Sequence, residues 1–283
     1  MTDNRSEGPF QIGIVGIGLI GGSLAKAAKR AGMRVCAWNR SKAVERAAVE
    51  DGSADCVLDG ETVKGCKVVF VALPPDAVGP WVDSMAGSFA PGTIVADCAG
   101  VKRAICAEMR KYATGRDWTF VGGHPMAGRE RGGYGNSTAD LFDGASFIFT
   151  PYPSAGRIAL DILERVSKAL GFAQCVFTTP EEHDEMIALT SQLAHVVSSA
   201  YARDPAAPRH RGYSAGSFAD MTRVACVDPA LWTSLFLSNA DFLSAAVGGL
   251  VGRLEELKAA IDSRDAAALR ALLEKGAAAK ALL

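Results

Sequence analysis

The 283-residue sequence lacks the features that mark several classes of protein. A formal net charge of only −1 gives no electrostatic basis for binding nucleic acid or a membrane surface. No segment has the length and unbroken hydrophobicity of a membrane span, and the polar residues 1–9 lack the apolar core of a signal peptide. The seven cysteines form no C-x-x-C pair, and their odd number argues against a complete disulfide framework. We therefore expect a cytoplasmic protein with reduced thiols and no metal site, whose partner is a small molecule.

The order of short β-rich and helical stretches predicts an α/β fold. Expected strands cover residues 12–15, 34–38, 68–73, 93–97, 119–122, 146–150 and 174–178, and a helix covers 155–170. Strands that alternate with helices form right-handed crossovers and a largely parallel sheet. Residues 1–179 are therefore predicted to be a Rossmann-type dinucleotide-binding domain.

After Pro180 the pattern becomes helical throughout. Segments that begin near Glu181, Ser214, Pro229 and Ser263 are rich in Ala and Leu, with apolar positions three and four apart, and an irregular linker covers residues 203–213. Residues 180–283 are therefore predicted to be an all-helical domain. Its apolar stripes favour a homodimer interface, with burial against the first domain as the alternative, and they include Leu231, Leu235, Leu237 and Phe242.

A glycine-rich loop follows the first expected strand and opens a helix that runs to about Arg30. In the run Gly16-Ile17-Gly18-Leu19-Ile20-Gly21, the first glycine makes the turn, the second admits a pyrophosphate and the third packs the helix on the strand. Helix N-terminal N–H groups then face the phosphates. We expect Gly16, Gly18, Leu19, Ile20 and Gly21 to bind a dinucleotide; the alternative is a turn that holds nothing.

The end of the second strand bears on the choice between NAD and NADP. NAD-binding chains usually carry an acid there for the ribose 2′-hydroxyl, but this sequence has Asn39-Arg40-Ser41. These side chains can hydrogen-bond a 2′-phosphate, and arginine adds a charge-assisted contact. NADP is therefore favoured, while an Arg40 that stacks on adenine would leave NAD usable. Leu73 and Pro74 are expected to line the cofactor crevice.

A histidine lies among small residues in the run Gly123-His124-Pro125-Met126-Ala127-Gly128. An imidazole can accept or donate a proton near neutral pH, and the neighbouring glycines permit turns that bring a substrate close to the chain. His124 is therefore the candidate catalytic residue; the alternative is a histidine packed in a loop.

Together with these two glycine-containing runs, two further motifs resemble the prephenate and arogenate dehydrogenases of tyrosine biosynthesis: Ser191-Gln192-Leu193-Ala194-His195 and Phe218-Ala219-Asp220-Met221-Thr222-Arg223. The resemblance covers nearly the whole chain. It implies oxidative decarboxylation of a cyclohexadienol, in which a hydride moves to the nicotinamide and aromatisation drives the loss of carbon dioxide. His124 would accept the proton of the substrate's C4 hydroxyl, and Arg223 would hold a carboxylate. His195 would be a polar group on the substrate side, and Glu130 and Asp220 would be orienting neighbours.

The sequence departs from the family pattern at three positions. Gly100 stands where the family commonly has a serine whose hydroxyl helps orient the catalytic histidine, so another group must supply that hydrogen bond or the imidazole is less well oriented. Gln192 and Ala194 replace the usual His and Pro. Prephenate is ranked ahead of arogenate, with use of both left open. His183 is interpreted as structural and His210 as solvated.

Two other functions remain open from the sequence. A dehydrogenase of the β-hydroxyacid or imine-reducing kind also joins a Rossmann domain to a helical one, but such enzymes usually place a lysine on an early helix of the second domain. Residues 181–201 contain no lysine. A non-catalytic nucleotide-sensing protein would keep the fold without the chemistry, an alternative suggested by Gly100.

Overall fold

The computed structural model describes residues 10–129 and 131–282, which form two compact units. The first consists of Met1–Ile187 and Cys226–Ser238, and the second of Ala188–Ala225 and Asn239–Leu283. The predicted boundary between residues 179 and 180 stays a prediction. The polar segment 1–9 and the candidate Glu130 lie outside the described residues.

The first unit is built on an eight-stranded sheet with the order β3-β2-β1-β4-β5-β6-β7-β8. Every neighbouring pair is parallel except β6 and β7, which are antiparallel. This arrangement confirms the predicted Rossmann-type sheet. The strands are β1 Gln11–Val15, β2 Arg34–Trp38, β3 Cys56–Val57, β4 Val68–Val71, β5 Ile94–Asp97, β6 Thr119–Pro125, β7 Ser146–Pro151 and β8 Gln174–Phe177.

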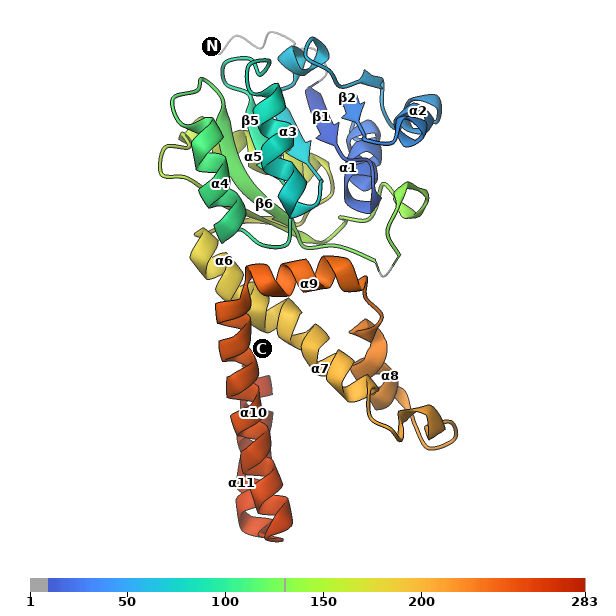
Figure 1. Ribbon diagram of the computed structural model, residues 1–283, viewed down its shortest axis with the longest axis vertical. Coiled ribbons are helices and arrows are strands. Elements are labelled where there is room, and N and C mark those ends of the chain that lie inside the picture. The colour runs from blue at the N-terminus through green and yellow to red at the C-terminus, as the bar shows by residue number, and fades with distance from the viewer. Residues whose placement is uncertain (1–9, 130, 283) are drawn as a thin grey trace. The chain divides into compact units, whose positions relative to one another are not determined.

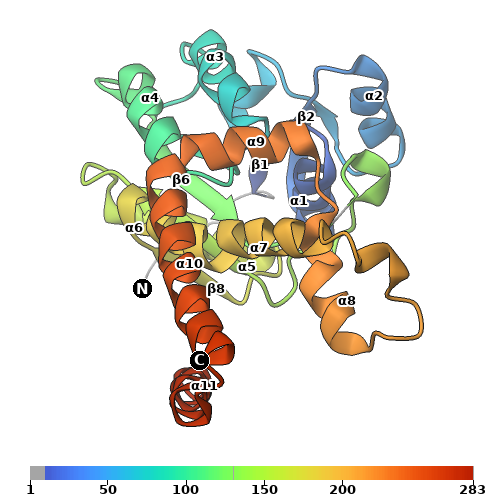
Figure 2. The same ribbon diagram turned by 60° about the horizontal axis from the view of Figure 1, so that its bottom comes forward.

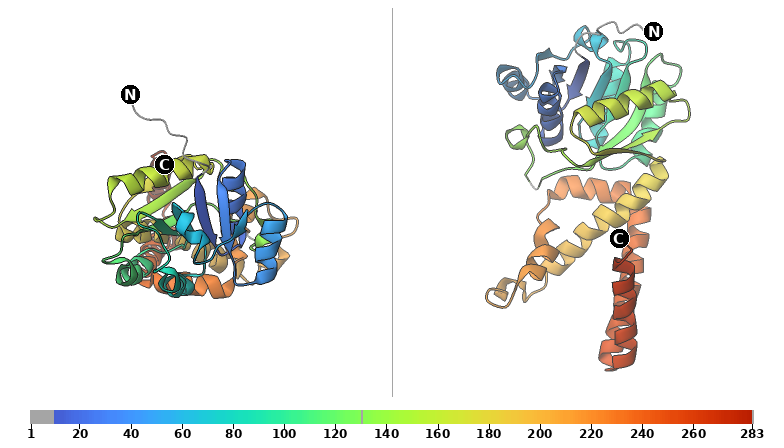
Figure 3. Two further views of the ribbon diagram at one scale, coloured as in Figure 1. Left: turned by 90° about the horizontal axis from the view of Figure 1, so that it is seen from above. Right: turned by 180° about the vertical axis from the view of Figure 1, so that it is seen from behind.

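Helices cover both faces of this sheet (Figure 3). One hydrophobic core lies under α1 (Leu19–Arg30), α2 (Lys42–Glu50) and α5 (Arg157–Ala169), where Leu24, Ala48 and Leu163 are fully buried. The other lies under α3 (Pro75–Met85) and α4 (Arg103–Ala113), with Val78 and Met109 fully buried. The central strands are buried on both sides, which is why they appear in the sequence as continuous apolar runs. Two 3₁₀ turns, Thr62–Gly65 and Tyr134–Asn136, complete the connections.

Strand β6 is longer than predicted, and the difference moves His124 from a loop into the sheet. The strand continues through Pro125 because His124 pairs with Ile148 and Pro125 with Phe147 in antiparallel β7. The expectation that the residues around His124 turn sharply is therefore wrong for Gly123. A Cβ there would lie 2.4 Å from the Asp97 carbonyl oxygen, so this glycine is needed for close approach of two strands.

The second unit is helical, as predicted. It contains α7 (Leu193–Ala202), α8 (Gly216–Thr222), α10 (Ala240–Asp262) and α11 (Ala266–Lys280), together with a π-helical turn at Ala188–Gln192 and 3₁₀ turns at Ala207–Arg209 and Arg223–Ala225. Helix α7 packs against α8, and α10 packs along α11 (Figures 1 and 2). The helices α6 (Pro180–Ile187) and α9 (Pro229–Ser238) belong to the first unit.

The helical segment that begins at Pro229 divides at Asn239, a break that the apolar pattern does not predict. Asn239 is fully buried, and its side-chain amide donates to Oε1 of Gln192 at 2.9 Å. This hydrogen bond gives each of the two buried side chains a polar partner. In the described part of the chain no single helix is long and apolar enough to cross a membrane, although α9 and α10 together reach that length and hydropathy as a broken pair.

Candidate active site

The glycine loop after β1 has the backbone geometry of a phosphate cradle. Gly16 has a φ of +86°, and a Cβ on it would lie 2.4 Å from the Ala72 carbonyl oxygen. A Cβ on Gly21 would lie 1.9 Å from the carbonyl oxygen of Gly16, whereas one on Gly18 would meet open space. Helix α1 starts at Leu19 without a side-chain cap on its first N–H groups. These residues fit a dinucleotide pyrophosphate, because the first N–H groups of α1 have no side-chain cap and the space beside Gly18 is open to a phosphate.

At the end of β2, Asn39 stabilises the glycine loop. Its Oδ1 accepts a hydrogen bond from the Ile17 N–H at 2.9 Å, and its Nδ2 donates to the Ser41 carbonyl oxygen at 3.2 Å. Arg40 is exposed beside it. Leu73, which follows β4, lies close to the Gly16 backbone, and Pro74 precedes α3. Their place in the wall of the cofactor crevice stays a prediction.

One carboxylate does lie near this turn, although the sequence has no acid at the usual position. Glu45 of α2 is buried and accepts hydrogen bonds from the Asn39 N–H at 3.0 Å and from Lys42 Nζ at 2.9 Å. The Glu45 carboxylate is therefore hydrogen-bonded within the protein. The exposed charge in the Asn39–Ser41 turn therefore comes from Arg40.

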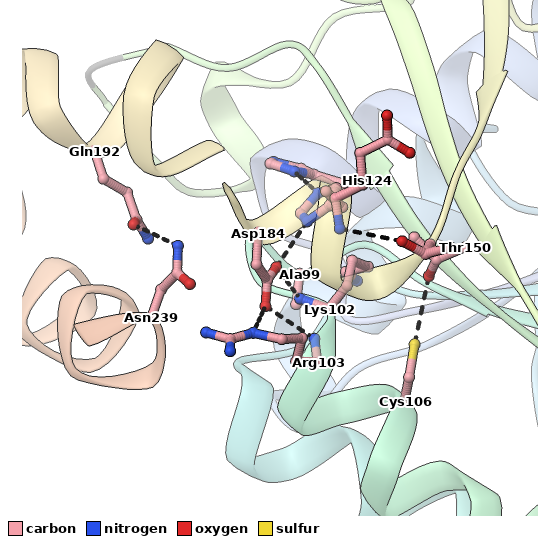
Figure 4. A network of polar contacts seen from close by, with 12 residues as sticks. Ala99, Lys102, Arg103, Cys106, His124, Thr150, Asp184, Gln192 and Asn239 are labelled. Atoms are coloured by element: carbon pink, nitrogen blue, oxygen red, sulfur yellow. Dashed lines mark hydrogen bonds and ion pairs between the residues drawn. The ribbon is translucent and has the colours of Figure 1, made fainter. Parts of the chain in front are cut away.

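The imidazole of His124 lies near Asp184 and Lys102 (Figure 4), and it contacts a second histidine. His124 Nδ1 is 2.9 Å from Nε2 of His183, and His183 Nδ1 is 2.8 Å from Oδ1 of Asp184. His183 and Asp184 are buried on α6, while His124 is partly exposed on β6. Burial, His183 and the nearby Lys102 ammonium keep the pKa of His124 well below its ordinary value of 6.5. The imidazole is therefore neutral at pH 7 and able to accept a proton.

A buried ion pair binds the backbone of Gly123, the residue that precedes His124 in β6. Lys102 Nζ contacts Asp97 Oδ2, with both side chains fully buried, and donates to the Gly123 carbonyl oxygen at 2.6 Å. Asp97 Oδ1 accepts from the Gly123 N–H at 3.0 Å, and Oδ2 accepts from the Ala99 N–H at 2.9 Å. The pair therefore fixes both backbone polar groups of the residue that precedes His124.

The remaining predicted site residues lie in the second unit. His195 is half-buried on α7, and its Nδ1 lies 2.9 Å from the Ser191 carbonyl oxygen. Because a carbonyl only accepts, Nδ1 is the donor of this hydrogen bond. Arg223 is exposed in the 3₁₀ turn that packs against α7, and Asp220 is exposed on α8. The structure thus places His195 and Arg223 on neighbouring elements of one unit, and His124 in the other.

Sequence reasoning missed the residues that surround His124. The sequence pattern predicts a structural role for His183 and assigns no role to Asp184, Asp97 or Lys102. The dipeptide His183-Asp184 at the start of a helix carried a signal, since a carboxylate beside a histidine fixes its tautomer. Its partner His124 lies 59 residues earlier in the chain, so no local sequence pattern links the two histidines.

Comparison with known proteins follows the same two-part organisation. The model of the prephenate dehydrogenase nucleotide-binding domain matches residues 24–176, and that of the prephenate dehydrogenase dimerization domain matches residues 179–275. The chain belongs to the prephenate dehydrogenase family. A curated relative, the cyclohexadienyl dehydrogenase of Zymomonas mobilis, is 31% identical over 90% of this chain and 89% of its own length.

Solved structures agree with this assignment. Arogenate dehydrogenase from Synechocystis superposes with a TM-score of 0.82 at 28% identity, covering 96% of this chain and 99% of that one. Prephenate dehydrogenase from A. aeolicus, in complex with hydroxyphenyl propionate and NAD+, gives 0.82 at 25% identity, covering 98% and 99%. This member of the family is an NAD(P)-dependent dehydrogenase that carries out oxidative decarboxylation of prephenate or arogenate in tyrosine biosynthesis. Neither alternative function is favoured.

Proposed function

We propose that this family member prefers prephenate to arogenate and NADP to NAD, works in the cytoplasm, and uses His124 as its proton acceptor. The observation that carries the last assignment is the neutral, partly exposed imidazole held at the carboxyl-terminal side of a central strand. The seven free cysteines support a reducing compartment.

In the proposed reaction, Nε2 of His124 accepts the proton of the substrate's C4 hydroxyl. The C4–H bond breaks with its electron pair, the ring loses its C1 carboxylate as carbon dioxide, and the electrons of that C–C bond complete the aromatic ring. The C4 oxygen is left as a phenolate, which takes the proton back from His124. Bound NAD(P)+ supplies the hydride acceptor. We assign a substrate carboxylate to Arg223, whose planar guanidinium suits bidentate contact, with His195, Asp220 and Glu130 as polar neighbours.

The cofactor preference is supported by charge at the end of β2. Arg40 is exposed there, and the buried carboxylate of Glu45 is bound by Lys42 and by the Asn39 N–H. A 2′-phosphate would therefore meet a guanidinium with no exposed acid in the Asn39–Ser41 turn to repel it.

Replacing Arg40 with alanine is expected to weaken NADP binding about 10–100-fold, the value of one charge-assisted hydrogen bond, while NAD binding changes less than about twofold. The measurement is steady-state turnover of prephenate and arogenate, each with NAD and NADP, for the wild type and Arg40→Ala. Arg116→Ala, an exposed arginine after α4, serves as the matched control. Equal losses for both cofactors would contradict the assigned role of Arg40, and higher kcat/KM with arogenate would reverse the substrate order.

We also propose a homodimer formed through the helical part of the chain. The matched dimerization model supports this, as do apolar side chains that are exposed in a single copy of α10 and α11, among them Leu254, Ile261 and Leu273. Light scattering during size exclusion should give twice the chain mass of 29.6 kDa. Ile261→Glu should shift the particle toward that single-chain mass, whereas Ile158→Glu, at an exposed site on α5, should not. A wild-type monomer would refute the proposal.

A further inference from the structure

The hydrogen bonds around His183 fix which nitrogen of His124 carries a proton. Asp184 Oδ1 accepts from the Lys102 N–H at 2.7 Å, and Oδ2 accepts from the Arg103 N–H at 3.0 Å and from Arg103 Nε at 3.3 Å. Burial raises the pKa of Asp184, but hydrogen bonds from His183, Arg103 and Lys102 outweigh it and lower that pKa. The carboxylate is therefore ionised and acts only as an acceptor.

A proton must then lie on each Nδ1 along the chain of contacts. Because Asp184 only accepts, His183 Nδ1 carries a proton, and burial lowers the pKa of His183 so that its ring is neutral. His183 Nε2 is consequently an acceptor. His124 must donate to it from Nδ1, 2.9 Å away, which leaves His124 Nε2 unprotonated. Only this tautomer can accept a proton from substrate through Nε2.

Gly100 has no hydroxyl that could hydrogen-bond the His124 ring and orient it. A Cβ on Gly100 would lie 3.9 Å from Cε1 of His124 and 3.3 Å from a methyl carbon of Leu235, so the glycine is next to the imidazole with an apolar side chain over it. Within the part of the chain that the structure describes, the hydrogen bond to His183 is the one that the His124 ring makes.

We propose that His183 and Asp184 are positioning residues that orient His124 and hold it in the Nδ1–H tautomer, in place of the hydroxyl that Gly100 lacks. The inference rests on the proposed role of His124 as proton acceptor. Asp184 is well placed for it, because it binds the first N–H groups of α4 and so joins His183 to a rigid helix start. When His124 gains a proton, its positive ring faces a chain of acceptors that ends in this carboxylate.

The direct test is the tautomer itself, read from ¹⁵N shifts of histidine-labelled protein. The chain has only four histidines, so His183→Leu, His195→Leu and His210→Leu assign the spectrum. The wild type should show His124 protonated at Nδ1 at pH 7.5, and His183→Leu should show a mixture of tautomers. A wild-type His124 protonated at Nε2 would overturn the inference without any activity measurement.

Kinetics separate positioning from structure. His183→Leu should lower kcat about 10–100-fold with the cofactor Kd unchanged, as for other residues that orient a reacting group. His183→Gln should recover most of that loss, because its amide oxygen can occupy the acceptor position of Nε2. If His183→Leu keeps kcat within twofold while His124→Asn abolishes turnover, the positioning role of His183 is refuted, whereas the role of His124 as proton acceptor is supported. If His124→Asn also turns over normally, the proton-acceptor assignment itself falls.

Discussion

Replacing His124 with asparagine is expected to lower kcat by about 10²–10⁴-fold, the usual contribution of a positioned general base. Asparagine keeps a polar side chain beside His183 but has no basic nitrogen to accept the hydroxyl proton. The cofactor Kd should stay within about twofold, because the glycine loop belongs to a different part of the sheet edge. Steady-state formation of the reduced nicotinamide measures kcat, and fluorescence titration measures the cofactor Kd.

The matched control is His210→Asn, which changes an exposed histidine that contacts Ser214 and should leave kcat unchanged. The pH profile adds an independent check. Since burial, His183 and Lys102 lower the pKa of His124 below 6.5, protonation should stop catalysis only below pH 6.5. An acid limb of kcat/KM above that value, or a His124→Asn variant within tenfold of wild type, would contradict the assignment.

Replacing Lys102 with methionine should cost about 3–5 kcal/mol of unfolding free energy, because it leaves the fully buried Asp97 carboxylate without its charge partner. The same substitution at Lys64, whose ion pair with Glu61 is exposed, should cost no more than about 1 kcal/mol. Urea unfolding followed by circular dichroism gives both values.

A second substitution separates lost charge from lost packing. Asp97→Asn in the Lys102→Met background removes the uncompensated carboxylate and should recover part of the stability. If Lys102→Met alone stays within 1 kcal/mol of the wild type, the pair does not contribute as its burial implies.

Local patterns in the sequence are enough to predict most of the sheet and the glycine loop after β1. Buried parallel strands are apolar throughout, and the spacing of Gly16, Gly18 and Gly21 has a direct steric meaning, so both could be predicted without distant contacts. Strand β3 was missed because two residues, Cys56 and Val57, are too few to produce a pattern.

What could not be predicted depends on long-range contacts. The extension of β6 needs antiparallel β7 beside it, and the break at Asn239 needs the amide of Gln192, 47 residues away. The partner of His124, His183 on α6, likewise lies 59 residues further along the chain. These features depend on which elements contact each other in the fold, and local patterns in one sequence do not reveal contacts between distant segments.

The two outer strands of the sheet have a bearing on how copies of the enzyme associate. One edge ends in β3, with two residues, and the other in β8, with four, whereas β6 inside the sheet has seven. Such short edges present few unpaired N–H and C=O groups to another chain. At high concentration, strand-to-strand aggregation of native molecules is therefore disfavoured.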